Sequence, residues 1–244
     1  NYLSGVIQHI FWTYLNEEER ATVQIKIEKE ISSLLNENLS SNIKKTLFNL
    51  YQSVAFNPVG SEKLYQIWEE NKVIENLFLN ESDYSSLAMK LAIYKHPKAK
   101  EILEEQQTRI SNADQLERFI WMLPSLSSDE NVRDSFMTSL LDKENREKES
   151  WVQTALNNIH HPLRQESSIK HLKSILEVLE EVQLTGDIFF PKGWLASSIG
   201  NYSSEEANLI LEEFLAENSN YNPILLKKLQ QTTDDLIRAQ RIKK

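Results

Sequence analysis

The chain has 244 residues, 40% of them hydrophobic, and only five glycines and six prolines, a composition that supports a buried core and favours long helices over a β-sandwich. The net charge of −9 makes nucleic acid an unexpected partner, because an acidic surface repels phosphate. The absence of cysteine excludes disulfides and thiolate metal sites, and no apolar run is long enough to predict a membrane span.

Apolar residues recur at helical spacing from the beginning of the chain. The first predicted helix has a broad apolar arc formed by Leu3, Val6, Ile7, Ile10, Phe11, Tyr14 and Leu15. Asn16 is the predicted cap of a second helix, which is followed by a helix over residues 41–56 and by another around residues 64–68. Asn80 is the predicted cap of the next helix, and a polar helix follows over residues 98–110.

The second half continues the helical pattern. Asn112 is predicted to begin a helix, and Ser127 with Glu130 has the spacing of a capping box. The remaining predicted helices cover residues 145–159, a short stretch after Pro162, residues 169–182, a segment begun by a second capping box at Ser203 and Glu206, and residues 222–240. The nearest candidate strand, residues 187–190, is too short and has no partner.

The six prolines are 27 to 39 residues apart, which suits a series of helical hairpins. We therefore predict an all-α fold, an α-α superhelix of irregular HEAT-like hairpins, that forms a single domain over residues 1–244. The apolar arc of the first helix is wider than one neighbouring helix would cover. We expect a preceding helix or domain to cover it, which would make the chain a piece of a larger protein truncated on its N-terminal side. In the isolated chain, self-association through the first helix would cover the arc instead.

The sequence lacks the residue patterns of a catalytic centre. A zinc peptidase needs two histidines one helical turn apart, in the motif H-E-x-x-H, but no two of the five histidines have this spacing. We therefore expect no metal site in this chain. His160 and His161, next to Pro162, are interpreted as a turn that ends a helix, with their charge favourable at the helix C-terminus; a contact with a ligand or a partner domain is the alternative.

Other candidate features have structural interpretations. The acidic run at residues 177–181 is interpreted as a solvated helix face rather than as paired catalytic carboxylates. The glycines form no phosphate-binding loop, and no G-x-S-x-G elbow is present. The five tryptophans lie within or beside apolar stripes, so we interpret them as core residues rather than as a ligand cage.

Several blocks resemble, in order, the C-terminal helical domain of aminopeptidase N-type zinc metallopeptidases of the gluzincin class. Residues 10–15 (IFWTYL), followed by Arg20, are similar to the family pattern iYW-x-fL…R. Residues 114–127 (DQLERFIWMLPSLS) resemble the stretch D-L-x-R-F-x-x-x-L-P-a-L-S of bacterial members, those of Bacteroidetes in particular. Further similar blocks lie at residues 47–55, 64–68, 151–165 and 186–194.

The resemblance implies a non-catalytic domain that closes the active-site chamber of the parent enzyme and limits which peptides enter. Its partners would be the catalytic domain of the same polypeptide and the peptide substrates, and the family habit is periplasmic or secreted. Zinc would lie in the catalytic domain, whose H-E-x-x-H and G-x-M-E-N motifs do not occur here. His161 and Arg164 are the candidate substrate contacts, because polar residues at an inter-helix turn can reach a neighbouring domain.

Two other functions compete with this one. An independent HEAT-like scaffold would bind proteins on its concave face. A stand-alone enzyme with an unrecognised site is disfavoured by the residue inventory. The upstream coding sequence discriminates the first two, since only a peptidase parent carries H-E-x-x-H before this segment.

Overall fold

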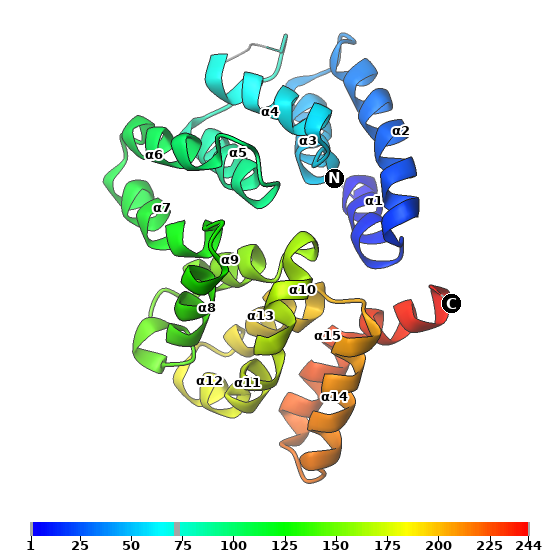
Figure 1. Cartoon of the computed structure of the whole chain (residues 1–244), viewed down its shortest axis with the longest axis vertical. Helices are drawn as coiled ribbons and strands as arrows, with labels where there is room; N and C mark the ends of the chain where they lie inside the picture. The colour runs from blue at the N-terminus through cyan, green and yellow to red at the C-terminus, as the bar shows by residue number, and fades with distance from the viewer. Residues whose placement is uncertain (1, 71–73, 244) are drawn as a thin grey trace. The chain divides into compact units, whose positions relative to one another are not determined.

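The computed structural model describes residues 2–70 and 74–243, and within them it is all-helical, with no strand, as the composition and periodicity predicted (Figure 1). Contacts between helices group into two compact units, Asn1–Trp121 and Met122–Lys244. Within the described residues, helices supply the regular structure of both units. The finer prediction, HEAT-like hairpins that form one domain, stays a prediction.

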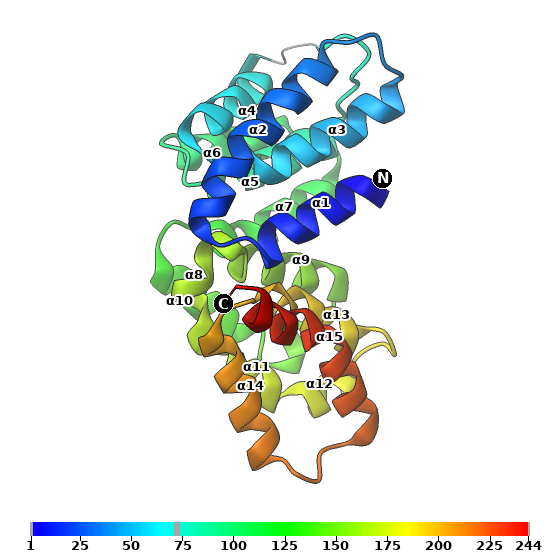
Figure 2. The same ribbon diagram turned by 90° about the vertical axis from the view of Figure 1, so that its right-hand side faces the viewer.

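The first unit consists of α1 (Tyr2–Thr13), α2 (Glu17–Leu35), α3 (Ser41–Val54), α4 (Pro58–Glu70), α5 (Glu81–Ile93), α6 (Ala99–Arg109) and most of α7 (Ala113–Leu126). Sequential helices pack as neighbours: α2 on α3, α4 on α5, and α5 on α6. Helix α1 packs on α3, and the two helices lie side by side in Figure 2.

The second unit begins with the end of α7 and continues with α8 (Glu130–Ser139), η1 (Lys143–Asn145), α9 (Glu149–Ile159), η2 (Pro162–Arg164), α10 (Gln165–Ser168), η3 (Ile169–His171), α11 (Leu172–Glu177), α12 (Leu179–Thr185), α13 (Phe190–Ser197), η4 (Ile199–Asn201), α14 (Glu205–Glu217) and α15 (Pro223–Ile242). Helix α13 packs on both α9 and α15, and α14 packs on α11. The stripe predicted over residues 169–182 is broken into three short helices. The candidate strand at residues 187–190 is a turn that leads into α13.

The predicted helix starts at Asn16 and Asn80 are confirmed in atomic detail, and those at Ser127 and Ser203 are displaced. The Asn16 side chain accepts a hydrogen bond from the Glu19 backbone N–H at 2.9 Å while Glu19 accepts one from the Asn16 N–H, which makes a capping box. Asn80 forms the equivalent box in α5. The predicted box at Ser127 is wrong, since Asp129 caps α8 through the N–H of Asn131. The cap of α14 is likewise one residue later than predicted.

Large aromatic side chains fill the core of each unit. Trp68 in the first unit and Trp194 in the second are fully buried, and each indole N–H has an acceptor. Trp68 donates to Gln106 Oε1 at 2.7 Å, and Trp194 donates to the carbonyl oxygen of Ile175 at 3.1 Å. The interpretation of the tryptophans as core residues is confirmed for these two, whereas the other three are only partly buried.

Two glycines of the first unit should respond oppositely to replacement by alanine. A Cβ at Gly5 would meet nothing within 4 Å, so Gly5→Ala should raise the free energy of unfolding by about 0.5–1 kcal/mol through helix propensity. A Cβ at Gly60 would lie 2.9 Å from Ala55 Cβ and 3.1 Å from the Ala55 carbonyl carbon, so Gly60→Ala should lower it by about 1–3 kcal/mol. Urea unfolding followed by circular dichroism measures both. Equal effects would contradict this packing.

Candidate functional site

The two residues predicted to contact substrate, His161 and Arg164, lie in the turn between α9 and α10. His161 is half-buried, and its Nδ1 accepts a hydrogen bond from the backbone N–H of Leu163 at 3.2 Å, which caps η2. Arg164 has only 5% of its surface exposed. A role in substrate binding stays a prediction for both residues. Their hydrogen bonds within the second unit show that they also stabilise its helix ends.

The guanidinium of Arg164 ties together the ends of two helices. It donates to the carbonyl oxygens of Ser125 at 2.7 Å, Leu126 at 3.1 Å and Asn158 at 3.2 Å. Ser125 and Leu126 end α7, and Asn158 lies in the last turn of α9. The carbonyl oxygens in the last turn of a helix receive no hydrogen bond from within the helix, so they need another donor. Burial, with the nearby charge of Arg133 as a smaller cause, lowers the pKa of Arg164 to about 10, so the guanidinium stays protonated at neutral pH.

His160 is the second buried polar group of this turn. The helix α9 ends at Ile159, which confirms the interpretation of the two histidines as a helix-ending turn. The imidazole is fully buried, and its Nδ1 lies 2.8 Å from the Tyr202 hydroxyl. Burial, with a smaller effect from His171, lowers its pKa to about 3. His160 is therefore neutral, and the expected favourable histidine charge at the helix C-terminus is wrong for this residue.

A chain of hydroxyl groups continues from His160. The Tyr202 hydroxyl lies 2.8 Å from Ser168 Oγ, and Ser168 also donates to the Arg164 carbonyl oxygen. A serine linked to a histidine suggests an activated nucleophile, but these three side chains are each at most 3% exposed. A substrate atom cannot reach Ser168 without displacing the core. The arrangement is therefore a buried hydrogen-bond network that holds α9, α10 and the segment before α14 together.

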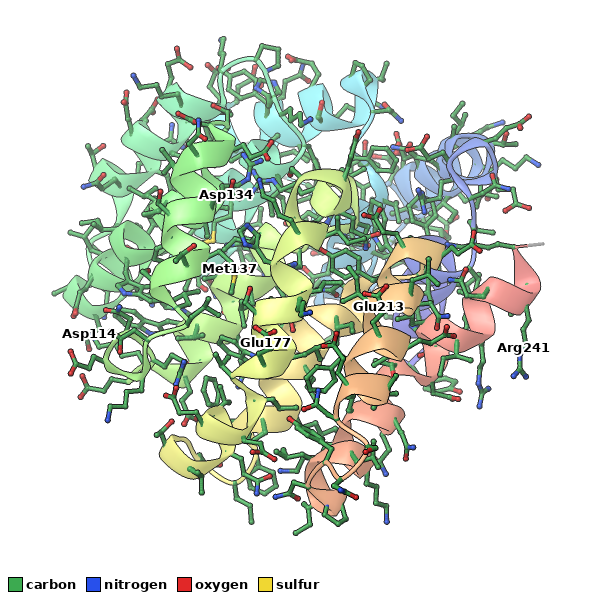
Figure 3. All side chains as sticks on the ribbon, turned by 60° about the horizontal axis from the view of Figure 1, so that its bottom comes forward. Asp114, Asp134, Met137, Glu177, Glu213 and Arg241 are labelled. Carbon is green, nitrogen blue, oxygen red and sulfur yellow. The ribbon has the colours of Figure 1, made fainter. Side chains whose placement is uncertain are left out.

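A second polar cluster fixes α8 against the segment before α11. Asp134, labelled in Figure 3, lies 2.7 Å from His171 Nε2 and 2.6 Å from Lys170 Nζ. Lys170 also pairs with Glu130 at 2.6 Å. Burial raises the pKa of Asp134, but hydrogen bonds from Lys170 and His171 outweigh that effect and leave the pKa below its usual value. The hydrogen bonds from these two side chains thus favour the ionised form of this carboxylate.

An acidic cavity of about 540 Å³ lies where α11 and α12 approach the loop between α14 and α15. Its lining residues are Glu177, Glu180, Phe214, Glu217, Asn218, Ser219, Asn220 and Tyr221. Figure 3 labels Glu177, and Glu217 forms an exposed ion pair with Lys173 at 3.4 Å. Burial, with the Glu180 carboxylate as a smaller cause, raises the pKa of Tyr221 to about 12.

The lining of this cavity suits a positively charged group, because carboxylates and the rings of Phe214 and Tyr221 both favour cations. Within residues 2–70 and 74–243, no group of three or more His, Cys, Asp or Glu side chains has an arrangement that could hold a metal ion. The sequence interpretation of residues 177–181 as a solvated face agrees with the exposure of Glu177 and Glu180. The sequence analysis did not predict the cavity, because the loop at residues 218–221 that completes it is distant in sequence from Glu177 and Glu180.

The comparisons with known proteins do not assign the chain to a family. No protein-family model matches the sequence, and no curated protein matches it either. Within the described part of the chain, none of the helices is sufficiently long and apolar to cross a membrane. Inferences about function therefore rest on the residue blocks and on the side-chain environment.

Proposed function

We propose that the chain is the C-terminal helical domain of an aminopeptidase N-type zinc peptidase, where it closes the active-site chamber and gates peptide entry. The observation that supports the proposal is that blocks resembling the family supply the packing residues of both units. Trp68, Phe119 and Trp194 come from three such blocks, and each is at most 1% exposed. Arg164, from a fourth block, holds the ends of α7 and α9.

In this proposal the catalytic chemistry belongs to another domain of the same polypeptide. Zinc, held there by H-E-x-x-H, would activate the water that attacks the peptide bond. The residues of this chain form a wall that determines which peptides reach that centre. His161 is the candidate to face the catalytic domain, because Arg164 is turned into the interior of its own unit.

The coding sequence upstream of residue 1 tests the proposal. We expect an in-frame H-E-x-x-H motif, with a G-x-M-E-N motif nearby, within a few hundred codons. A start codon and signal peptide directly before Asn1 would instead favour an independent scaffold.

Zinc is expected not to stabilise this chain. A ligand raises the melting temperature only by binding the folded state, so micromolar Zn²⁺ should shift it by less than about 1 °C. Differential scanning fluorimetry of protein dialysed against a chelator measures the shift, with Mg²⁺ as a control. A zinc-specific rise of several degrees would place a metal site in this chain and contradict the proposal.

An independent protein-binding scaffold remains the second candidate, and one surface favours it. Leu184, near the end of α12, and Ile188 and Phe189, in the turn between α12 and α13, are exposed large apolar side chains. The turn is anchored, since Lys228 Nζ donates to the Ile188 carbonyl oxygen at 3.2 Å. An anchored apolar turn is the kind of surface that a protein partner covers. A stable complex with another protein, lost on Phe189→Ser, would support this function.

A further inference from the structure

Helix α1 turns its apolar stripe toward solvent. Leu3, Ile7 and Ile10 are 72%, 37% and 45% exposed, and Phe11 is the single residue of the helix that is buried among the described residues. At 100° per residue, the three exposed side chains fall within an arc of about 60°. They form one continuous stripe, which we call the α1 stripe.

The packing of α1 on α3 uses a different side of the helix. The Trp12 indole donates to the Ser53 carbonyl oxygen at 3.1 Å, and Phe11 and Trp12 both contact the ring of Phe56. These contacts fix the orientation of α1 in its unit. The α1 stripe is therefore held outward, and covering it requires no rotation of the helix.

We propose that the α1 stripe is an interface between two copies of this chain, packed as an antiparallel helix pair about a twofold axis. This inference concerns the isolated chain of residues 1–244; in the larger protein of the proposed function, a preceding helix or domain would cover the stripe instead. Helix α1 contains no Asp, Glu, Lys or Arg, although a quarter of the whole chain is charged. A charged partner or an anionic lipid surface would therefore meet no opposite charge on this face. The α1 stripe of a second copy is equally apolar and uncharged, so the two stripes can pack without burying an unpaired charge.

The spacing of the stripe fits its own reversed copy. Leu3 precedes Ile7 by four residues and Ile10 follows it by three, so the stripe is nearly symmetric about Ile7. An antiparallel pair brings the two Ile7 side chains together at the axis and sets each Leu3 beside the partner's Ile10. Such a contact is isologous and closes as a dimer rather than extending into a filament.

The interface is small, and its response to salt follows from the charge. A 12-residue helix is about 18 Å long, so the pair buries less than the roughly 1,200–2,000 Å² of a stable interface, and we expect a dissociation constant on the order of 100 μM. Two copies with a net charge of −9 repel each other. Raising the salt concentration should screen that repulsion and strengthen association, opposite to the behaviour of an interface made of ion pairs.

Cross-linking tests the geometry, because the natural chain has no cysteine. Under mild oxidation, Ile7→Cys should form a disulfide-linked dimer at least about tenfold faster than Ile25→Cys, a 66%-exposed control on α2. A mixture of Leu3→Cys and Ile10→Cys chains should cross-link mainly as the mixed pair. Equal rates for Ile7→Cys and Ile25→Cys would overturn the proposal, and a preference for Leu3→Cys with itself would overturn the antiparallel arrangement.

Sedimentation equilibrium tests the association itself. The wild-type chain should show a weight-average mass that rises above 28.5 kDa between about 10 and 300 μM protein, and the rise should increase with salt. The double variant Leu3→Gln/Ile7→Gln should stay monomeric, whereas Ile25→Gln should behave as the wild type. All three sites are exposed, so circular dichroism should be unchanged. A monomeric wild type, association that survives in the double variant, or binding of the stripe to phosphatidylcholine vesicles in place of a second copy would each overturn the proposal.

Discussion

Replacing Arg164 by alanine is expected to lower the free energy of unfolding of the second unit by about 3–5 kcal/mol. The guanidinium is buried and donates to the carbonyl oxygens of Ser125, Leu126 and Asn158. Its removal leaves these acceptors without their donor and opens a cavity between the ends of α7 and α9. Urea unfolding followed by circular dichroism measures the loss, at neutral pH where the guanidinium is charged.

Two further variants separate this role from a general effect of losing an arginine. Arg164→Lys keeps one charged donor group but cannot reach three carbonyl groups at once, so an intermediate loss is expected. Arg241→Ala removes an exposed arginine in the last turn of α15, labelled in Figure 3, and should change stability by less than about 0.5 kcal/mol. Equal effects of Arg164→Ala and Arg241→Ala would show that the buried network does not stabilise the unit.

Lowering the pH should destabilise the second unit through His160. Its pKa is about 3 in the folded protein and about 6.5 in the unfolded chain. Between these pH values the unfolded state binds one more proton than the folded state. Lowering the pH therefore stabilises the unfolded state and decreases the free energy of unfolding. The contribution of His160 to stability is fully present above pH 6.5 and decreases by about 1.4 kcal/mol for each pH unit below it. At pH 4.5 the loss of stability is therefore roughly 2–3 kcal/mol.

The comparison with His160→Gln isolates this contribution from those of other groups. Glutamine does not titrate, so the difference in unfolding free energy between wild type and variant should move by about 2–3 kcal/mol in favour of the variant from pH 7.5 to pH 4.5. Carboxylates such as Glu28, whose pKa is raised mainly by burial, titrate alike in the wild type and in the variant. Their contributions therefore cancel in the difference between the two unfolding free energies. A difference that is the same at both pH values would show that His160 is not held neutral.

Local sequence signals predicted much of the fold. Helical periodicity predicted the all-α structure, and Asn16 and Asn80 were recognised as caps because their hydrogen bonds span only three residues. Ser127 was mistaken for a cap because Asp129, two residues later, has the extended backbone that an N-cap needs and competes for the same helix. Where two capping residues are close together, the surrounding packing decides between them.

The environment of the candidate site residues could not be predicted in the same way. The partners of Arg164 in α7 are 38 and 39 residues away, and the hydroxyl that contacts His160 belongs to Tyr202, 42 residues away. Sequence spacing identified the polar turn but gave no information on whether its side chains point inward. The neutral state of His160 likewise follows from burial, which depends on how the helices of the second unit assemble.

The most direct test of the proposed function is the peptidase activity of the complete polypeptide that the gene encodes, with and without residues 1–244. Both forms should bind one equivalent of zinc and hydrolyse a single-residue chromogenic substrate. We predict that removing this domain reduces the discrimination in kcat/KM between short and long peptides by at least about tenfold, since it removes the wall of the chamber. Unchanged discrimination, or no zinc-dependent aminopeptidase activity in the complete polypeptide, would contradict the account.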